Sequence, residues 1–179
     1  MNFCYYEKNK KIEVDFELPP NWMYARLGDL ITLKSGRDLE PTQYNSNNKG
    51  IPYITGASNL NNGSLFVNRW TENPMVIATK GELLITCKGT IGEMAYNTIG
   101  NIHIARQIMS ISSNYIILPY IKIFLASYIN VLQAQAKSMI PGISRENILQ
   151  AIIPIPPIKE QYRIIGKYEQ IKRILKDEI

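Results

Sequence analysis

Two adjacent prolines, Pro156 and Pro157, constrain this chain more than any other feature of its sequence. Each proline fixes its own φ angle and disfavours helix in the residue before it, so a helix can start after the pair but cannot run through it. The preceding stretch "AIIPIP" predicts a strand, whereas the charged residues that follow favour a helix. We therefore expect a body, residues 1–157, and a helix, residues 158–179, that leaves the body at a fixed angle.

The expected helix carries an apolar stripe along one side. Its members recur about every 3.5 residues, which is the period of a coiled coil. The stripe consists of Ile158, Tyr162, Ile165, Tyr168, Ile171 and Leu175. An isolated helix of about 20 residues is marginal in water and needs a surface to pack on. We expect a partner helix to cover the stripe, and packing on the chain's own body is the alternative.

The body is rich in short strands and polar loops, which predicts the α+β fold class. Residues 1–17 are expected to be loosely structured. The other expected elements are strands near 32–35, 51–55 and 101–112, at least two strands within 75–96, a helix over 118–137 and a short helix capped by Ser144. The prediction is a strand-rich domain with a protruding, coiled-coil-type C-terminal helix.

The sequence contains no recognisable catalytic or metal-binding motif. It lacks a phosphate-binding loop of the G-x-x-x-x-G-K-[ST] type. The glycine-rich "KGTIGE" (88–93) lacks the full G-x-G-x-x-G spacing, so a tight turn is expected there and a nucleotide-binding loop is the alternative. The one histidine, His103, lies between two isoleucines and is expected to be structural. Cys4 and Cys87 are expected to stay reduced. We expect a non-catalytic chain without a bound metal.

Charge and hydropathy indicate where the chain is expected to be located and what it can bind. No apolar run reaches the ~20 residues that span a bilayer, and the first residues lack the apolar core of a signal peptide, so a cytoplasmic location is expected. The net charge of +5 and the pI of about 9.1 are compatible with nucleic acid. Many of the body's cations stand singly beside Gly, Ser, Thr or Asn in predicted turns. Such positions suit a surface that follows phosphates and reads base edges.

Five stretches, taken in their order and spacing, resemble the specificity subunits of type I restriction–modification systems. They are "FELPPNWMYARLGDLITLKSGRDL", "IPYITGASNL", "KGELLITCKGTIGE", "ARQIM" and "IPGISRENILQAIIPIPPIKEQYRII", and the resemblance covers residues 16–179. It implies a target recognition domain that reads one half of a split DNA sequence, and a spacer helix that packs antiparallel on another helix. It also implies methyltransferase (modification) subunits and a motor-nuclease (restriction) subunit as partners.

A complete subunit of that family has two recognition domains and two helices, whereas this sequence has one of each. The resemblance therefore suggests a half-subunit, or one domain of a longer subunit, and the short form is expected to make a homodimer through its helix. S-adenosylmethionine, ATP and Mg²⁺ are expected on the partner subunits and no cofactor on this chain. The alternatives are an RNA-binding or protein-interaction module, or an enzyme with an unrecognised nuclease or methyltransferase site.

The layout of that family also suggests which turns face double-stranded DNA. They are the turn after Ser35, the Asn-rich loop at 58–63, the turns at 88–90 and 106–107, and the loop at 137–145. The candidate DNA contacts are Lys34, Ser35, Arg37, Asn59, Asn61, Asn62, Lys88, Thr90, Arg106, Gln107, Lys137, Ser138 and Arg145.

Overall fold

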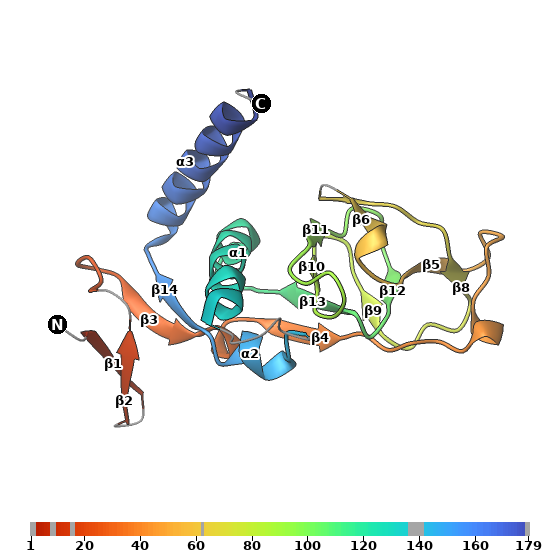
Figure 1. Ribbon diagram of the computed structural model, residues 1–179, viewed down its shortest axis with the longest axis horizontal. Helices are drawn as coiled ribbons and strands as arrows, with labels where there is room; N and C mark the ends of the chain where they lie inside the picture. The colour runs from red at the N-terminus through yellow and green to blue at the C-terminus, as the bar shows by residue number, and fades with distance from the viewer. Residues whose placement is uncertain (1–2, 8–9, 15–16, 62, 136–141, 178–179) are drawn as a thin grey trace.

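The computed structural model describes residues 3–7, 10–14, 17–61, 63–135 and 142–177. In Figure 1 two small sheets lie to one side of helix α1 (Leu118–Gln135), and helix α3 (Ile158–Asp177) projects from the body as an arm. The expected α+β class, with strands in the body and a terminal helix, is confirmed. Within the described residues, no helix combines the length and apolarity that crossing a membrane requires.

The first sheet has four antiparallel strands in the order β11–β10–β13–β4. These strands are β4 (Thr32–Ser35), β10 (Leu83–Thr86), β11 (Met94–Tyr96) and β13 (Ile108–Ser112). All of β10 is buried, because successive side chains of a strand point to opposite faces and here each face meets a different core. Leu83 and Ile85 join the core under α1, whereas Leu84 joins a second core in the neighbouring sheet.

The second sheet has the order β8–β5–β12–β9. Its strands are β5 (Ile51–Ile54), β8 (Trp70–Thr71), β9 (Ile77–Ala78) and β12 (Ile102–Ile104), and the short hairpin β6 (Leu60–Asn61) with β7 (Ser64–Leu65) lies beside it. Strands β5 and β12 are parallel, and the other pairs are antiparallel. Ile54, Ile102 and Ile104 are fully buried and form the second core together with Leu84.

Strand β3 (Met23–Arg26) pairs antiparallel with strand β14 (Ile152–Ile155), although the two are far apart in the sequence. Helix α2 (Arg145–Leu149) comes just before β14, and the Ser144 hydroxyl accepts a hydrogen bond from the Asn147 amide at 3.1 Å. The expected cap is therefore confirmed. Short 3-10 turns occur at η1 (Leu27–Asp29), η2 (Pro41–Gln43) and η3 (Ala57–Asn59).

The expectation of a loosely structured N-terminal segment is wrong. Strands β1 (Phe3–Glu7) and β2 (Lys10–Val14) form an antiparallel hairpin in which Tyr5 pairs with Ile12 and Phe3 with Val14. Aromatic and β-branched residues favour extended backbone, and these strands contain several of them. The many charges of this segment concealed that preference.

The elbow after strand β14 has the expected form, and helix α3 begins directly after Pro157. The Gln161 side chain is buried in the first turn of the helix. It donates a hydrogen bond to the Pro156 carbonyl at 3.1 Å and accepts one from the Ile117 amide at 3.3 Å. The Tyr120 hydroxyl of α1 donates to the Pro154 carbonyl at 2.8 Å. These contacts fix the direction in which α3 leaves the body.

Candidate nucleic-acid interface

A tight turn at residues 105–108, here termed the hub turn, joins strands β12 and β13. The Ile108 amide donates to the Ala105 carbonyl at 2.9 Å, which closes the turn. The Ala105 amide donates to the Ile54 carbonyl at 2.9 Å, and the Gly36 amide donates to the Ile108 carbonyl at 3.0 Å. The segments that follow β4 and β5 therefore reach the same turn.

Gly36 is needed for this close approach. A side chain at that position would overlap the backbone carbonyl of Ala105, which cannot move aside without disturbing the hub turn. Because glycine has no Cβ, two backbones can pass this closely. The Ser35-Gly36 break in the sequence thus marks a contact between segments as well as the end of a strand.

The loop after β10 completes the arrangement. The Cys87 amide donates to the Gln107 carbonyl at 2.8 Å, and the Ile143 amide donates to the Cys87 carbonyl at 2.8 Å. The turn at 88–90 and the segment that leads into α2 consequently join the hub turn as well. Of the five expected segments, the structure therefore brings four together, as far as it describes them. The fifth, the Asn-rich loop, is instead bound to the end of β5.

Seven of the expected contacts expose their side chains around this framework: Ser35, Arg37, Lys88, Thr90, Arg106, Gln107 and Arg145. Within the described part of the chain, no residue hydrogen-bonds or ion-pairs with the side chains of Arg37 and Lys88. The Arg145 guanidinium differs, because it donates to the Leu33 carbonyl at 2.6 Å and so braces β4. Exposed cations with free donors can bind phosphate oxygens.

Arg106 has an acidic neighbour that the sequence analysis missed. Its Nε lies 2.8 Å from Oδ2 of Asp38, and its backbone amide donates to Oδ1 of the same carboxylate at 3.0 Å. Both side chains are well exposed, at 67% for Arg106 and 46% for Asp38. An acid placed directly after Arg37 in a glycine turn was the only available signal, and nothing in the sequence linked it to Arg106.

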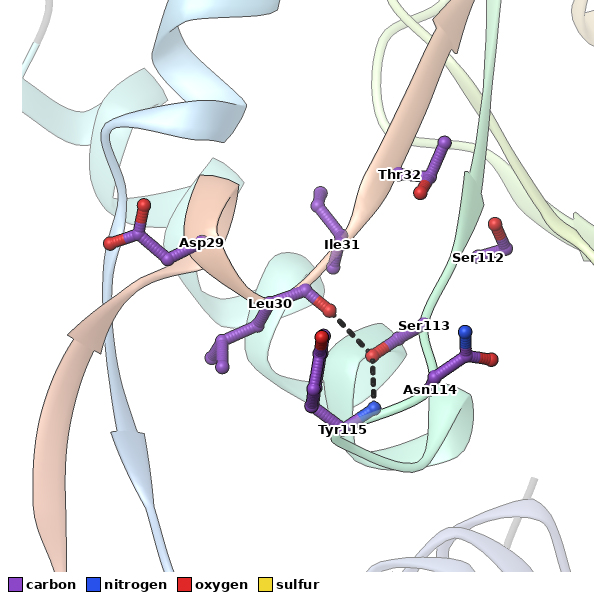
Figure 2. Close-up of a pocket in the computed structure, with 8 residues that line it drawn as sticks. All are labelled: Asp29, Leu30, Ile31, Thr32, Ser112, Ser113, Asn114 and Tyr115. Carbon is purple, nitrogen blue, oxygen red and sulfur yellow. Dashed lines mark hydrogen bonds between the residues drawn. The ribbon is translucent and has the colours of Figure 1, made fainter.

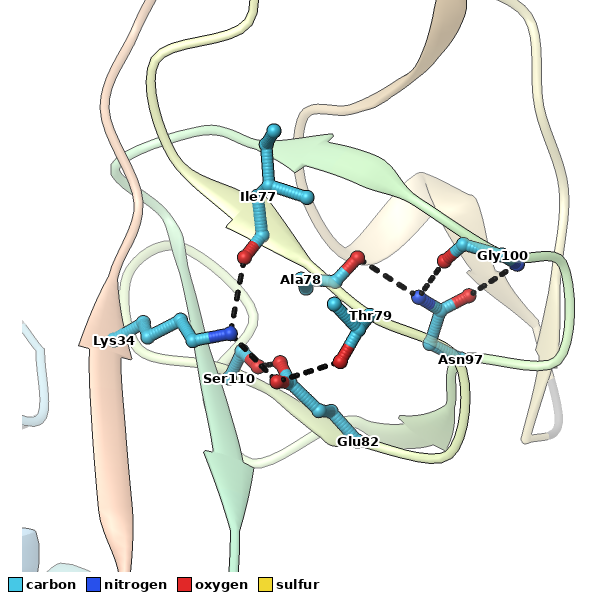
Figure 3. A network of polar contacts seen from close by, with 8 residues as sticks. All are labelled: Lys34, Ile77, Ala78, Thr79, Glu82, Asn97, Gly100 and Ser110. Atoms are coloured by element: carbon cyan, nitrogen blue, oxygen red, sulfur yellow. Dashed lines mark hydrogen bonds and ion pairs between the residues drawn. The ribbon is translucent and has the colours of Figure 1, made fainter.

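Lys34 points into the body and does not belong to the exposed set. Figure 3 shows its ammonium between the Ile77 carbonyl and the Glu82 carboxylate, at 3.1 and 2.6 Å. Glu82 is 6% exposed and also accepts hydrogen bonds from the hydroxyls of Ser110 and Thr79. Burial tends to raise the pKa of Glu82, but these three donors outweigh burial and hold the pKa below its ordinary value.

Asn59 is fully buried and supports its loop from within. Its carbonyl oxygen accepts hydrogen bonds from the amide and hydroxyl of Thr55, at 2.9 and 3.0 Å. Its amide group donates to the Phe66 carbonyl at 2.8 Å. Because its donors and acceptors are used inside the protein, Asn59 positions the loop and does not offer its side chain to DNA. Asn61 contributes its backbone to β6, and Asn62, Lys137 and Ser138 lie outside the described residues.

His103 has the structural role expected from its apolar neighbours. It is fully buried, with Nε2 2.9 Å from the Arg37 carbonyl oxygen, and with Nδ1 3.0 Å from the Val76 carbonyl oxygen and 3.2 Å from the Val76 amide. The Arg37 carbonyl can only accept, so Nε2 carries a proton, and in the neutral ring Nδ1 then accepts from the Val76 amide. Burial lowers the pKa of His103, although its contacts with the Arg37 and Val76 carbonyl oxygens tend to raise it, and the neutral ring is therefore favoured. The ring thereby holds the backbone from which Arg37 projects.

A small polar cavity of about 90 Å³ lies where β13 ends beside the start of β4. Figure 2 shows that the Ser113 hydroxyl donates to the Leu30 carbonyl at 2.6 Å and accepts from the Tyr115 amide at 3.1 Å. A cavity of this size suits a few water molecules. Asp29 is the only acidic residue among those that line it, and the described residues hold no cluster of three or more metal-ligating side chains.

Helix α3 divides its apolar stripe between the body and solvent. Among the stripe residues Ile165 packs against the first core, as does its neighbour Ile164. The other stripe residues are 40% to 62% exposed: Ile158, Tyr162, Tyr168, Ile171 and Leu175. The expected alternative, packing on the chain's own body, thus holds for Ile165 among the stripe residues, and the rest of the stripe is exposed.

A groove of about 300 Å³ lies between α1, α3 and β11. The Lys122 ammonium lies 5.0 Å from the centroid of the Tyr96 ring, which also lines the groove. Burial and, next, the nearby Lys172 ammonium lower the pKa of Lys122, although Glu169 opposes them. The groove is therefore mainly apolar with a cationic wall.

Comparison with known proteins extends these observations. A family model described as the type I restriction modification DNA specificity domain matches residues 19–179. The chain is 24% identical to the specificity subunit of the type I restriction enzyme EcoBI of Escherichia coli, with 90% of this chain aligned. It is 23% identical to a Methanocaldococcus jannaschii protein named as the MjaX specificity subunit of a type I restriction enzyme, with 93% aligned. The alignments span only 38% and 40% of those relatives.

Several solved structures have a fold similar to that of this chain. The HsdS subunit from Thermoanaerobacter tengcongensis matches 90% of this chain with a TM-score of 0.80 and 22% identity, over 40% of its own length. A chain from a structural study of complex assembly and conformational transition in a type I R-M system also gives 0.80, at 21% identity, with 90% of this chain and 41% of that one covered. The S subunit from M. genitalium gives 0.59 at 17% identity, with 90% and 42% covered.

Proposed function

Because this chain belongs to the family of type I restriction modification DNA specificity domains, we propose that it reads one half of a bipartite sequence in double-stranded DNA. The observation that carries this proposal is the convergence of three other expected segments on the hub turn, which itself contains the expected pair 106–107. Exposed Arg, Lys and Gln side chains then stand on a backbone that is fixed from several sides. Such donors suit both phosphate oxygens and base edges.

The partners follow from the same proposal. Methyltransferase subunits and a motor-nuclease subunit would act on the DNA that this chain selects, and this chain would contribute no catalytic group. S-adenosylmethionine would then bind the methyltransferase subunits, and ATP and Mg²⁺ would serve the motor subunit. A cytoplasmic location also follows, since the DNA and these subunits would be found there.

Homodimer formation through α3 is the third part of the proposal. A two-fold dimer would place the stripe of one helix antiparallel against its copy, with the two bodies at opposite ends. Identical bodies would then read the same half-site twice, which gives a split palindrome. The gap between the half-sites would follow the length of the helix, at about 1.5 Å per residue.

Salt-dependent binding tests the DNA-reading role. The chain should bind a fluorescent duplex with an affinity that falls steeply as salt rises, because each neutralised phosphate releases counterions. The substitution Lys88→Gln should weaken binding to all duplexes alike and flatten the slope of log affinity against log salt by about one unit. Tighter binding to single-stranded RNA than to duplex DNA would contradict the proposal. Methyl transfer by the chain alone, with S-adenosylmethionine supplied, would contradict the non-catalytic role.

A further inference from the structure

Arg106 lies in the hub turn and Arg37 beside it, and both are exposed, yet their surroundings differ. The Arg106 guanidinium forms an ion pair with Asp38, with Nε 2.8 Å from Oδ2. The Arg37 guanidinium has no ion-pair or hydrogen-bond partner among the described residues. We propose that Arg106, aligned by Asp38, reads a guanine in the major groove, and that Arg37 contacts phosphate. This inference rests on the proposed function and specifies one base that the chain would read.

The first argument concerns which donors of Arg106 are free. A guanidinium carries five N–H donors, and the ion pair with Asp38 lies at the Nε end, where Nε is 2.8 Å from Oδ2. The two terminal nitrogens keep their donors, and the described residues give them no acceptor. That free end is the fork that fits the O6 and N7 acceptors of guanine.

The second argument concerns charge. Asp38 places a carboxylate directly beside the Arg106 guanidinium, so an approaching phosphate would meet a negative charge at close range. The edge of a base carries no net charge and avoids most of this repulsion. A cation paired with an acid therefore suits a base edge better than phosphate, and the unpaired Arg37 suits phosphate.

The third argument concerns order. The carboxylate of Asp38 contacts both the backbone and the side chain of Arg106, because Oδ1 accepts a hydrogen bond from its backbone amide and Oδ2 forms an ion pair with its Nε. A long side chain that is already aligned loses less conformational freedom on binding. Ion pairs this exposed add little to folding stability, so stability does not account for the pair.

The first experiment selects binders from a randomised duplex library with the wild-type chain and with Arg106→Lys. Wild type should enrich a motif that contains a guanine, and Arg106→Lys should lose the preference at that guanine alone. Failure of wild type to enrich any motif would overturn the proposed function and the inference with it. An enriched motif whose guanines all persist in Arg106→Lys would overturn the inference and leave the proposed function standing.

The second experiment replaces that guanine by 7-deazaguanine in the selected duplex, which removes the N7 acceptor. Wild type should lose about tenfold in affinity or more, in the range that one good base contact supplies. Arg106→Ala should bind both duplexes equally, whereas the matched variant Arg37→Gln should bind both more weakly and keep the ratio between them. If Arg106→Ala keeps the wild-type ratio of affinities for the guanine and 7-deazaguanine duplexes, the assignment of Arg106 is overturned.

Asp38→Asn tests the positioning role of the carboxylate. Asparagine can still accept the Arg106 amide but offers no charge to the guanidinium. The discrimination between guanine and 7-deazaguanine should fall severalfold, while affinity for unrelated duplexes stays the same or rises because a negative charge is lost. Thermal unfolding of Asp38→Asn at the wild-type temperature would establish that the body is intact. Unchanged discrimination in a folded Asp38→Asn would remove Asp38 from the mechanism.

Discussion

At the hub turn the exposed side chains are polar and their backbone is held by hydrogen bonds from distant segments, whereas helix α3 exposes apolar side chains on a backbone that hydrogen-bonds within itself. The first region is complete without a partner, because water can satisfy its free donors. The second is not, because Tyr162, Ile171 and Leu175 leave apolar surface in solvent.

This difference indicates which of the two proposed contacts, with DNA or with a partner helix, can be temporary. A polar surface on a rigid frame can bind and release DNA without changing its own fold. An apolar helix that extends into water gains stability only while another surface covers it. We therefore expect the DNA contact to depend on salt and the helix contact to depend on apolar area.

The largest effect is expected from replacing Tyr162, Ile171 and Leu175 together by Glu. These side chains are exposed, so the body should fold as before, but the proposed dimer should dissociate. We expect the dissociation constant of the dimer to rise at least a thousandfold, which corresponds to about 4 kcal/mol. Analytical ultracentrifugation measures the change.

The matched control for the helix carries Lys167→Glu, Gln170→Glu and Arg173→Glu, which changes charge more but leaves the exposed apolar side chains in place. It should remain dimeric. A wild-type chain that stays monomeric at high concentration would contradict the dimer and remove the main contrast between the two regions.

The second largest effect is expected from Glu82→Gln, which disturbs the frame that β10 shares with β4 and β13. The change removes the negative charge that pairs with the Lys34 ammonium and weakens the hydrogen bonds from Ser110 and Thr79. Because Lys34 is one-third exposed, water can replace part of the loss, and unfolding should become easier by roughly 2–3 kcal/mol. Urea denaturation measures it, and the exposed Glu93→Gln should change stability by less than about 0.5 kcal/mol.

A smaller effect should follow pH. The pKa of Glu82 in the folded protein lies below its ordinary value of 4.5, so its contribution to stability is present above that value and is lost as pH falls through the folded pKa. Wild type and Glu82→Gln should therefore differ most near neutral pH and converge at acid pH. A difference that stays constant down to pH values of about 3 would show that the ionised carboxylate is not what stabilises the network.

The smallest effect is expected from Gly166→Ala in α3. A methyl group at this position meets no atom within 4 Å, so the change adds helix propensity without a clash. The helix should gain about 0.5–1 kcal/mol, seen as higher helicity or slower amide exchange in α3. Exchange at the hub turn should not change, which would confirm that the two regions are stabilised separately.

The sequence predicted the parts of this fold that depend on local patterns. Pro156 and Pro157 mark the elbow because their effect on φ is local, and the Ser144 cap follows from a short-range preference. The N-terminal hairpin was missed because the charges of β1 and β2 concealed a strand preference. The pairing of β3 with β14 joins distant segments and left no local mark.

The candidate site was predictable as a set of turns but not as a set of side chains. Arg37 and Lys88 emerged from their neighbours in the sequence, and the structure leaves them exposed. Lys34 stands in a similar setting, yet it faces Glu82, a partner far along the chain. The alignment of Arg106 by Asp38 likewise depends on the meeting of two segments, which the sequence alone does not specify.

Strand β10 has a consequence for how the protein unfolds. Because Leu83 and Ile85 belong to one core and Leu84 to the other, neither core can open without exposing apolar groups of the same strand. The two sheets should therefore melt as one cooperative unit, and the amides of β10 should exchange with solvent only when the whole body opens. A substitution deep in either core would then weaken the backbone hydrogen bonds of the hub turn without touching it. The effect would pass through β10, a strand of four residues.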